Sequence, residues 1–171
     1  IKSSFNNIGF ETKVTHNYFI LNKPSTLLLG QKFFKGNTIN SQGPGSNSFD
    51  ADFDFDYNMY PNYENQSNYE NPNINTAFFL ENIIYLNGKM SIIPGIRYEY
   101  IKTQSDGYFR QINTDNADNV IFNQLNFSSE SRERSFFLFG LGYSYNLSSQ
   151  LEIYANCSQN YRAVTFADIN I

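Results

Sequence analysis

The clearest pattern in the chain is an alternation of large apolar residues with small or polar ones between positions 137 and 147. The large residues at every second position are Phe137, Phe139, Leu141, Tyr143, Tyr145 and Leu147. A period of two is typical of a β-strand whose two faces meet different environments. A polar turn at 148–150 follows, and the chain returns over 151–162. This stretch therefore predicts a long hairpin with one apolar face.

Two further hairpins are predicted upstream. Residues 5–21 and 26–36 flank a polar turn at 22–25, and residues 75–86 and 90–103 flank Asn87-Gly88-Lys89. Asn-Gly between alternating strands is a strong hairpin signal. In the first hairpin, alternation is expected to separate Glu11 and Lys13 from the apolar positions beside them. The chain is thus expected to be all-β, with about six strands in three hairpins.

The connections between the predicted hairpins, 37–74 and 104–131, are long and polar, whereas the turns inside the hairpins are short. Short turns at one end and long loops at the other are typical of outer-membrane barrels. Strands of about ten residues also suit a tilted membrane crossing. Six strands are too few to close, because the smallest such barrels have about eight. The sequence predicts an antiparallel transmembrane β-barrel segment within a larger barrel whose chain continues at both ends.

Two alternatives fit the same pattern. A soluble β-sandwich, for example a carbohydrate-binding module, would pack its apolar faces against each other. A smaller barrel would act as a passive pore or as an adhesin. Mean hydropathy, at −0.48, does not decide between them, because in a membrane barrel only alternate residues face lipid.

Composition narrows the function. The 171 residues carry a net charge of −4, which disfavours nucleic acid as a partner because no basic stripe exists to neutralise phosphates. No nucleophile motif or phosphate loop is present, and the single histidine, His16, has no ligands at metal-binding spacing. We therefore expect neither an enzyme nor a bound cofactor. Cys157 is the only cysteine, so an internal disulfide is impossible.

Three blocks of sequence resemble TonB-dependent outer-membrane receptors. Residues 92–99 (IIPGIRYE) resemble a strand of that family that reads Pro-Gly, then Leu or Ile, Arg, Tyr or Phe, and Glu or Asp, and residues 77–82 (AFFLEN) resemble the strand before it. Residues 153–169 (IYANCSQNYRAVTFADI) resemble a later strand and the loop that follows it, and this motif is most similar to that of ferric-citrate-type receptors. The similarity is strongest over 75–171.

The resemblance implies a 22-stranded barrel around an N-terminal plug, which engages the energy-transducing TonB complex. Residues 1–171 would then be a partial barrel without the plug, with extracellular loops at 37–74 and 104–131. The implied function is import of a ferric siderophore or similar nutrient across the outer membrane of a Gram-negative bacterium. The lipid bilayer, the iron chelate and TonB would be the partners.

Several charged residues are candidates for ligand binding. Arg97 and Glu99 are expected on the face opposite Tyr98, where they would contact the plug or the substrate path, or would form an ion-pair ladder between neighbouring strands. Donors for the carboxylates of an anionic iron chelate are expected near strand ends, or these residues are ordinary rim charges. They are Arg132, Arg134 and Arg162.

A weak metal candidate lies in the first long polar segment. Four carboxylates there alternate with other residues, and such oxygens suit Ca²⁺, although the spacing is not that of an EF-hand. They are Asp50, Asp52, Asp54 and Asp56. The alternative is a solvated extracellular loop.

Overall fold

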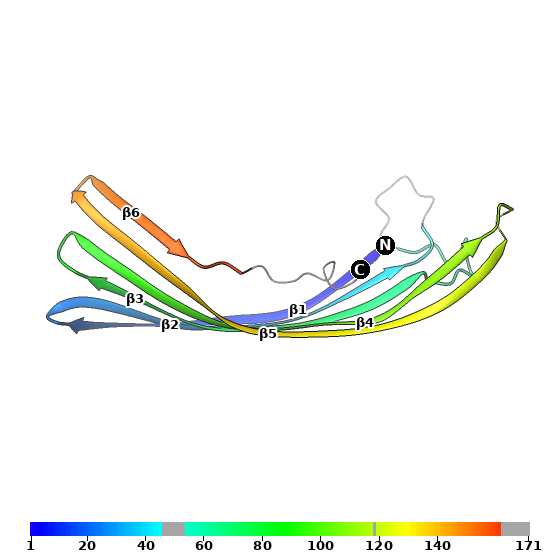
Figure 1. Ribbon diagram of the computed structural model, residues 1–171, viewed down its shortest axis with the longest axis horizontal. Helices are drawn as coiled ribbons and strands as arrows, with labels where there is room; N and C mark the ends of the chain where they lie inside the picture. Colours follow the sequence, from blue (N-terminus) through cyan, green and yellow to red (C-terminus); the bar gives the residue numbers. More distant parts are fainter. Residues whose placement is uncertain (46–53, 118, 162–171) are drawn as a thin grey trace.

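The residues described by the computed structural model, 1–45, 54–117 and 119–161, form one antiparallel β-sheet (Figure 1). Each strand pairs with the next along the chain, so the order in the sheet is the order in the sequence. The strands are β1 (Lys2–Ile20), β2 (Lys23–Gln42), β3 (Ser67–Tyr85), β4 (Met90–Thr114), β5 (Val120–Ser148) and β6 (Leu151–Ser158). The prediction of six antiparallel strands is confirmed.

Among the described residues, no helix is long and apolar enough to span a bilayer.

Strand register gives the sheet two unlike faces. Residues paired across antiparallel strands point to the same side, and successive residues point to opposite sides. One row across β1 to β5 is wholly apolar and defines the apolar face: Val14, Leu29, Leu80, Ile96 and Phe139. The adjacent row defines the polar face: Lys13, Gly30, Phe79, Arg97 and Leu138. The faces predicted from the alternation are therefore confirmed.

The sheet has almost no interior. Ala77 is the one buried hydrophobic side chain among the described residues, whereas Phe137, Phe139 and Leu141 are each more than half exposed. A soluble domain of this size would bury such side chains, since each contributes roughly 1.5–3 kcal/mol on burial. The β-sandwich alternative is wrong, because the described strands form one layer with no second sheet against the apolar face.

The sheet is bent along its strands, and the polar face is the concave one. Figure 1 shows the described residues after β6, 159–161, on the concave side. Tyr161, in that segment, packs on Phe136 of the polar face with ring centroids 4.2 Å apart. A sheet curved toward its polar side has the curvature expected of a barrel wall with a polar interior.

The first hairpin turn differs from the prediction of a turn at 22–25. Its two residues are Leu21 and Asn22, with φ of 49° and 62°. Positive φ at both central positions is the signature of a type I′ turn, which matches the twist of the flanking strands. Pro24 lies within β2 opposite Phe19, at the start of the strand, where a missing N–H is tolerated.

The predicted long loops were wrong in extent. Within 37–74, β2 continues as far as Gln42 and β3 already begins at Ser67. Within 104–131, every residue belongs to β4 or β5 except a short turn between Thr114 and Val120. Ladder hydrogen bonds need no apolar side chains, and polar cross-strand pairs such as Ser41 with Asn68, 2.6 Å apart, line these extensions. Hydrophobic alternation therefore marks only the part of each long strand that lies next to the short turns.

Candidate functional site

A cluster of charged side chains surrounds one aromatic ring at the centre of the polar face. Phe79 of β3 lies over Gly30 of β2, its register partner. A Cβ at position 30 would lie 2.2 Å from the Phe79 ring, so the ring occupies the space that a side chain there would need. Glycine is thus the residue that allows the aromatic ring to lie flat across the sheet.

Two cations flank this ring. Lys13 Nζ of β1 lies 5.8 Å from the ring centroid of Phe79, and Arg97 Cζ of β4 lies 5.4 Å from it. A cation within about 6 Å of an aromatic face is attracted by its quadrupole, by roughly 0.5–1 kcal/mol where water has access. Four adjacent strands therefore contribute to one arrangement: lysine, glycine, phenylalanine and arginine.

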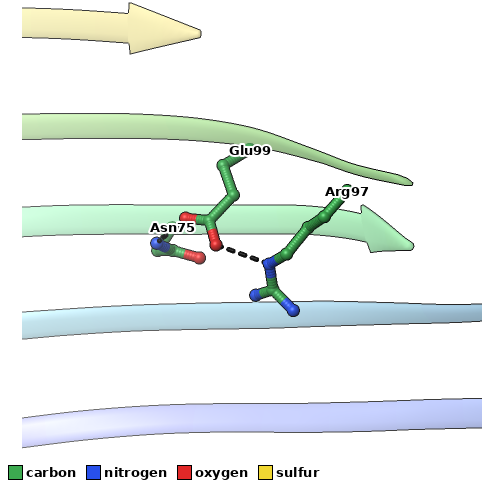
Figure 2. A network of polar contacts seen from close by, with 3 residues as sticks. All are labelled: Asn75, Arg97 and Glu99. Carbon is green, nitrogen blue, oxygen red and sulfur yellow. Dashed lines mark hydrogen bonds and ion pairs between the residues drawn. The ribbon is translucent and has the colours of Figure 1, made fainter. Parts of the chain in front are cut away.

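Both cations also pair with a carboxylate on their own strand. Lys13 Nζ lies 2.5 Å from Glu11, and Arg97 Nε lies 2.6 Å from Glu99. Figure 2 shows Glu99 between Arg97 and Asn75, whose side-chain amide donates to the second carboxylate oxygen at 3.2 Å. The predicted location of Arg97 and Glu99 opposite Tyr98 is confirmed. Their ion pair, however, joins positions two apart on one strand rather than neighbouring strands.

The cluster borders a hollow of about 530 Å³ on the concave side. Arg97 uses one of its five N–H donors on Glu99, and Figure 2 shows its two terminal nitrogens directed away from that carboxylate. A guanidinium with free terminal donors can receive a carboxylate or another anionic oxygen pair in a bidentate manner. Chemically, the site can bind an anion through arginine while an aromatic ring supports its apolar part.

The other candidate arginines lie farther along the strands. Arg132 and Arg134 of β5 are on the polar face, opposite Thr103 and Ile101 of β4. Arg134 donates a hydrogen bond to the Tyr161 hydroxyl at 2.7 Å, and Arg132 is exposed. Arg162 lies outside the described residues. The polar face thus carries three of the predicted arginines, but Arg97 lies apart from the other two along the strand direction.

The structure describes two of the four aspartates proposed for metal. Asp54 forms an ion pair with Lys2 at 2.5 Å, and Asp56 accepts a hydrogen bond from the Met59 backbone at 2.9 Å. Asp50 and Asp52 lie outside the described residues. Within the described ranges, no three acidic, histidine or cysteine side chains gather closely enough to hold a metal ion.

Phe79 and Lys13 were not among the predicted site residues. Their contact depends on the register between separate hairpins, which places Lys13, Gly30, Phe79 and Arg97 in one row. The alternation of residues along β1 placed Lys13 on the correct face, but it did not predict which side chains of the other strands would contact Lys13.

Comparisons with known proteins agree with this architecture. A family model described as "TonB dependent receptor-like, beta-barrel" matches residues 2–171. The ferric-catecholate import receptor Fiu of Escherichia coli K12, in its closed form, has a similar fold: TM-score 0.67, 13% identity, 91% of this chain and 23% of that one covered. Its open form gives a TM-score of 0.67 at 12% identity, covering 91% and 25%. The chain thus spans about a quarter of those structures. No curated protein matches the sequence.

Proposed function

Because the chain belongs to the TonB-dependent receptor β-barrel family, we propose that it forms part of the wall of an outer-membrane importer for a ferric siderophore or similar nutrient. The observation that supports this best is the two-faced, single-layer sheet. Its exposed apolar face suits lipid, and its concave face carries paired charges around an anion-competent arginine. Energy would come from the TonB complex, acting through a plug domain in another part of the protein.

The proposed orientation follows from strand length. The apolar band runs from about Phe10 to Ile20 on β1, and those eleven residues suit one tilted crossing of the hydrocarbon core. The short turns after β1, β3 and β5 would face the periplasm. The polar extensions of β2 to β5 would stand outside the cell, where segments 37–74 and 104–131 meet the ligand first.

The polar-face arginines are proposed to guide the chelate inward. Fiu, a structural relative, is described as a ferric-catecholate import receptor. Catecholate and carboxylate chelates of iron both present anionic oxygens, and arginine donors at successive depths suit either. Arg132 and Arg134 would meet the ligand before Arg97 does. The aromatic ring of Phe79 would contact its apolar parts.

The test is iron uptake by the full-length protein in a bacterial strain that lacks its own iron-chelate receptors. Uptake should saturate with ligand concentration and should disappear when TonB is deleted. Uptake that neither saturates nor needs TonB would instead show a passive pore.

The site itself is tested by substituting its arginine. Arg97→Gln should lower uptake at limiting ligand about tenfold or more, because a hydrogen bond to a charged group contributes roughly 1.5–3 kcal/mol. The double variant Arg97→Gln with Glu99→Gln removes the unpaired carboxylate that the single change leaves, and should fold normally yet remain impaired. Lys89→Gln, in a turn at the opposite end, is the matched control. Normal uptake by the double variant would contradict this role.

A further inference from the structure

A polar groove lies on the apolar face, next to the edge of the apolar band that is remote from the short turns. It measures about 410 Å³ and spans β1 to β3. The apolar-face residues that line it are Asn6, Ile8, Lys35, Asn37, Glu70 and Pro72. Amides, a cation and a carboxylate gather here, at the place where apolar side chains on this face give way to polar ones, and the transport proposal assigns them no role.

The groove presents hydrogen-bonding groups that the protein does not use. Lys35 is exposed and forms no ion pair within the described part of the chain. The Asn37 amide nitrogen donates to Glu70 at 2.7 Å, whereas its Oδ1 is buried without a hydrogen-bond donor. Asn6, the register partner of Asn37, brings a second amide to the same place.

An apolar track continues from this groove along the same three strands. Directly beyond Lys35, Phe10 and Phe33 stack with centroids 5.6 Å apart. An apolar groove of about 600 Å³ follows, lined by residues that include Val14, Leu29 and Leu80. From Lys35 to Leu29 is six residues, about 20 Å of strand. At a tilt of about 40° this projects to roughly 15 Å, half of a bilayer core about 30 Å thick.

We propose that this face of β1 to β3 binds one phosphorylated glycolipid of the outer leaflet, a proposal that rests on the membrane orientation given above. Lys35 receives the phosphate, as an unpaired ammonium suits a phosphate oxygen. Asn6 and Glu70 bind sugar hydroxyls, Asn37 holds Glu70 in place through its amide nitrogen, and an acyl chain runs past the Phe10–Phe33 stack into the apolar groove. The order of cation, amides, aromatic pair and apolar groove matches the order of groups along such a lipid.

The experiment uses the full-length protein in mild detergent, with bound lipid counted by native mass spectrometry during titration. The probes are lipid A, phosphatidylcholine, and glucosamine phosphate without acyl chains. The wild-type protein should retain one lipid A in preference to both others. Lys35→Gln and Asn37→Ala should each weaken retention about tenfold. Lys23→Gln should not, because Lys23 lies on the same strand and face but at the opposite end.

Three results would overturn the proposal. Equal retention by Lys35→Gln and Lys23→Gln would remove the headgroup site. Equal binding of phosphatidylcholine would reduce it to a generic apolar surface, and equal binding of glucosamine phosphate would make it a site for a soluble ligand. Iron uptake separates this proposal from the transport function. Lys35→Gln should import iron normally, whereas a failed transport proposal would show as absent uptake by a wild-type protein that still retains lipid.

Discussion

Replacing Gly30 with alanine tests the central arrangement of the polar face. The new Cβ would lie 2.2 Å from one carbon of the Phe79 ring and 2.4 Å from another, distances that no real contact permits. The ring must therefore move away from Gly30. Its movement would break the contacts that hold Lys13 and Arg97 over it, at 5.8 and 5.4 Å.

The expected cost follows from three contributions. If the ring moves, two cation–π contacts at solvent-accessible positions are lost, which costs about 1–2 kcal/mol. If the ring stays in place, overpacking against the new methyl group costs about 1–3 kcal/mol instead. Alanine in a strand recovers about 0.5–1 kcal/mol relative to glycine, because it restricts the unfolded chain. The free energy of unfolding should therefore fall by about 0.5–2 kcal/mol.

The assay is urea unfolding of the full-length protein folded into phospholipid vesicles, with folded and unfolded forms separated by electrophoresis without heating. Gly88→Ala is the matched control, since a Cβ at position 88 would meet nothing within 4 Å and its backbone φ is not positive. In a Phe79→Ala background the obstruction is gone, so Gly30→Ala should become neutral or stabilising by about 0.5–1 kcal/mol.

Independent effects of the substitutions at positions 30 and 79 would refute this explanation. If Gly30→Ala costs the same with and without the Phe79 ring, the ring is not what excludes a side chain at position 30. Equal effects of Gly30→Ala and Gly88→Ala in the wild-type background would lead to the same conclusion.

Two further predictions concern the apolar face and the outermost turn. Phe139→Arg should lower the free energy of unfolding in the same assay by about 2–4 kcal/mol, whereas Leu138→Arg, on the polar face, should not; equal costs would contradict the lipid-facing assignment. At the tip of the β4–β5 hairpin, hydrogen bonds from the Asn119 side chain and from the backbone N–H groups of Asn119 and Ala117 hold the pKa of Asp115 below its ordinary value of 3.8. A lowered carboxyl pKa stabilises the turn above pH 3.8, and this stability is lost as the pH falls through the folded-state pKa. Amide exchange at Ala117 and Asn119, corrected for its intrinsic rate, should therefore accelerate below that pH in the wild type but show no such dependence in Asp115→Asn.

The sequence predicted the faces of the strands well, because the alternation follows directly from the two environments that a strand separates. Glu11 and Lys13 lie together, and Arg97 lies opposite Tyr98, as expected. A period of two in the sequence is sufficient to assign residues to the two faces of a strand, even where the strand packs against no hydrophobic core.

Strand ends and the site were less predictable, for different physical reasons. Beyond the apolar band both faces are polar, so pairs such as Ser129 with Asp106 extend the ladder without any hydrophobic signal. The position of the first turn could not be predicted from Leu21 either, because leucine rarely adopts the positive φ that it has there. The Phe79 cluster needs the register between hairpins, which no single strand encodes.

The length of β5 has a mechanical consequence. Its 29 residues extend about 95 Å, and β4 stays hydrogen-bonded to it from Met90 to Asn113 without a break in register. A ribbon of continuous ladder resists stretching and shear far better than a free loop, so a load applied at its tip is carried down to the part of the wall beside Arg97. A force applied at the tip therefore bends a hydrogen-bonded two-stranded ribbon, and the stiffness of that ribbon, rather than the entropy of a flexible loop, limits how far the tip can move.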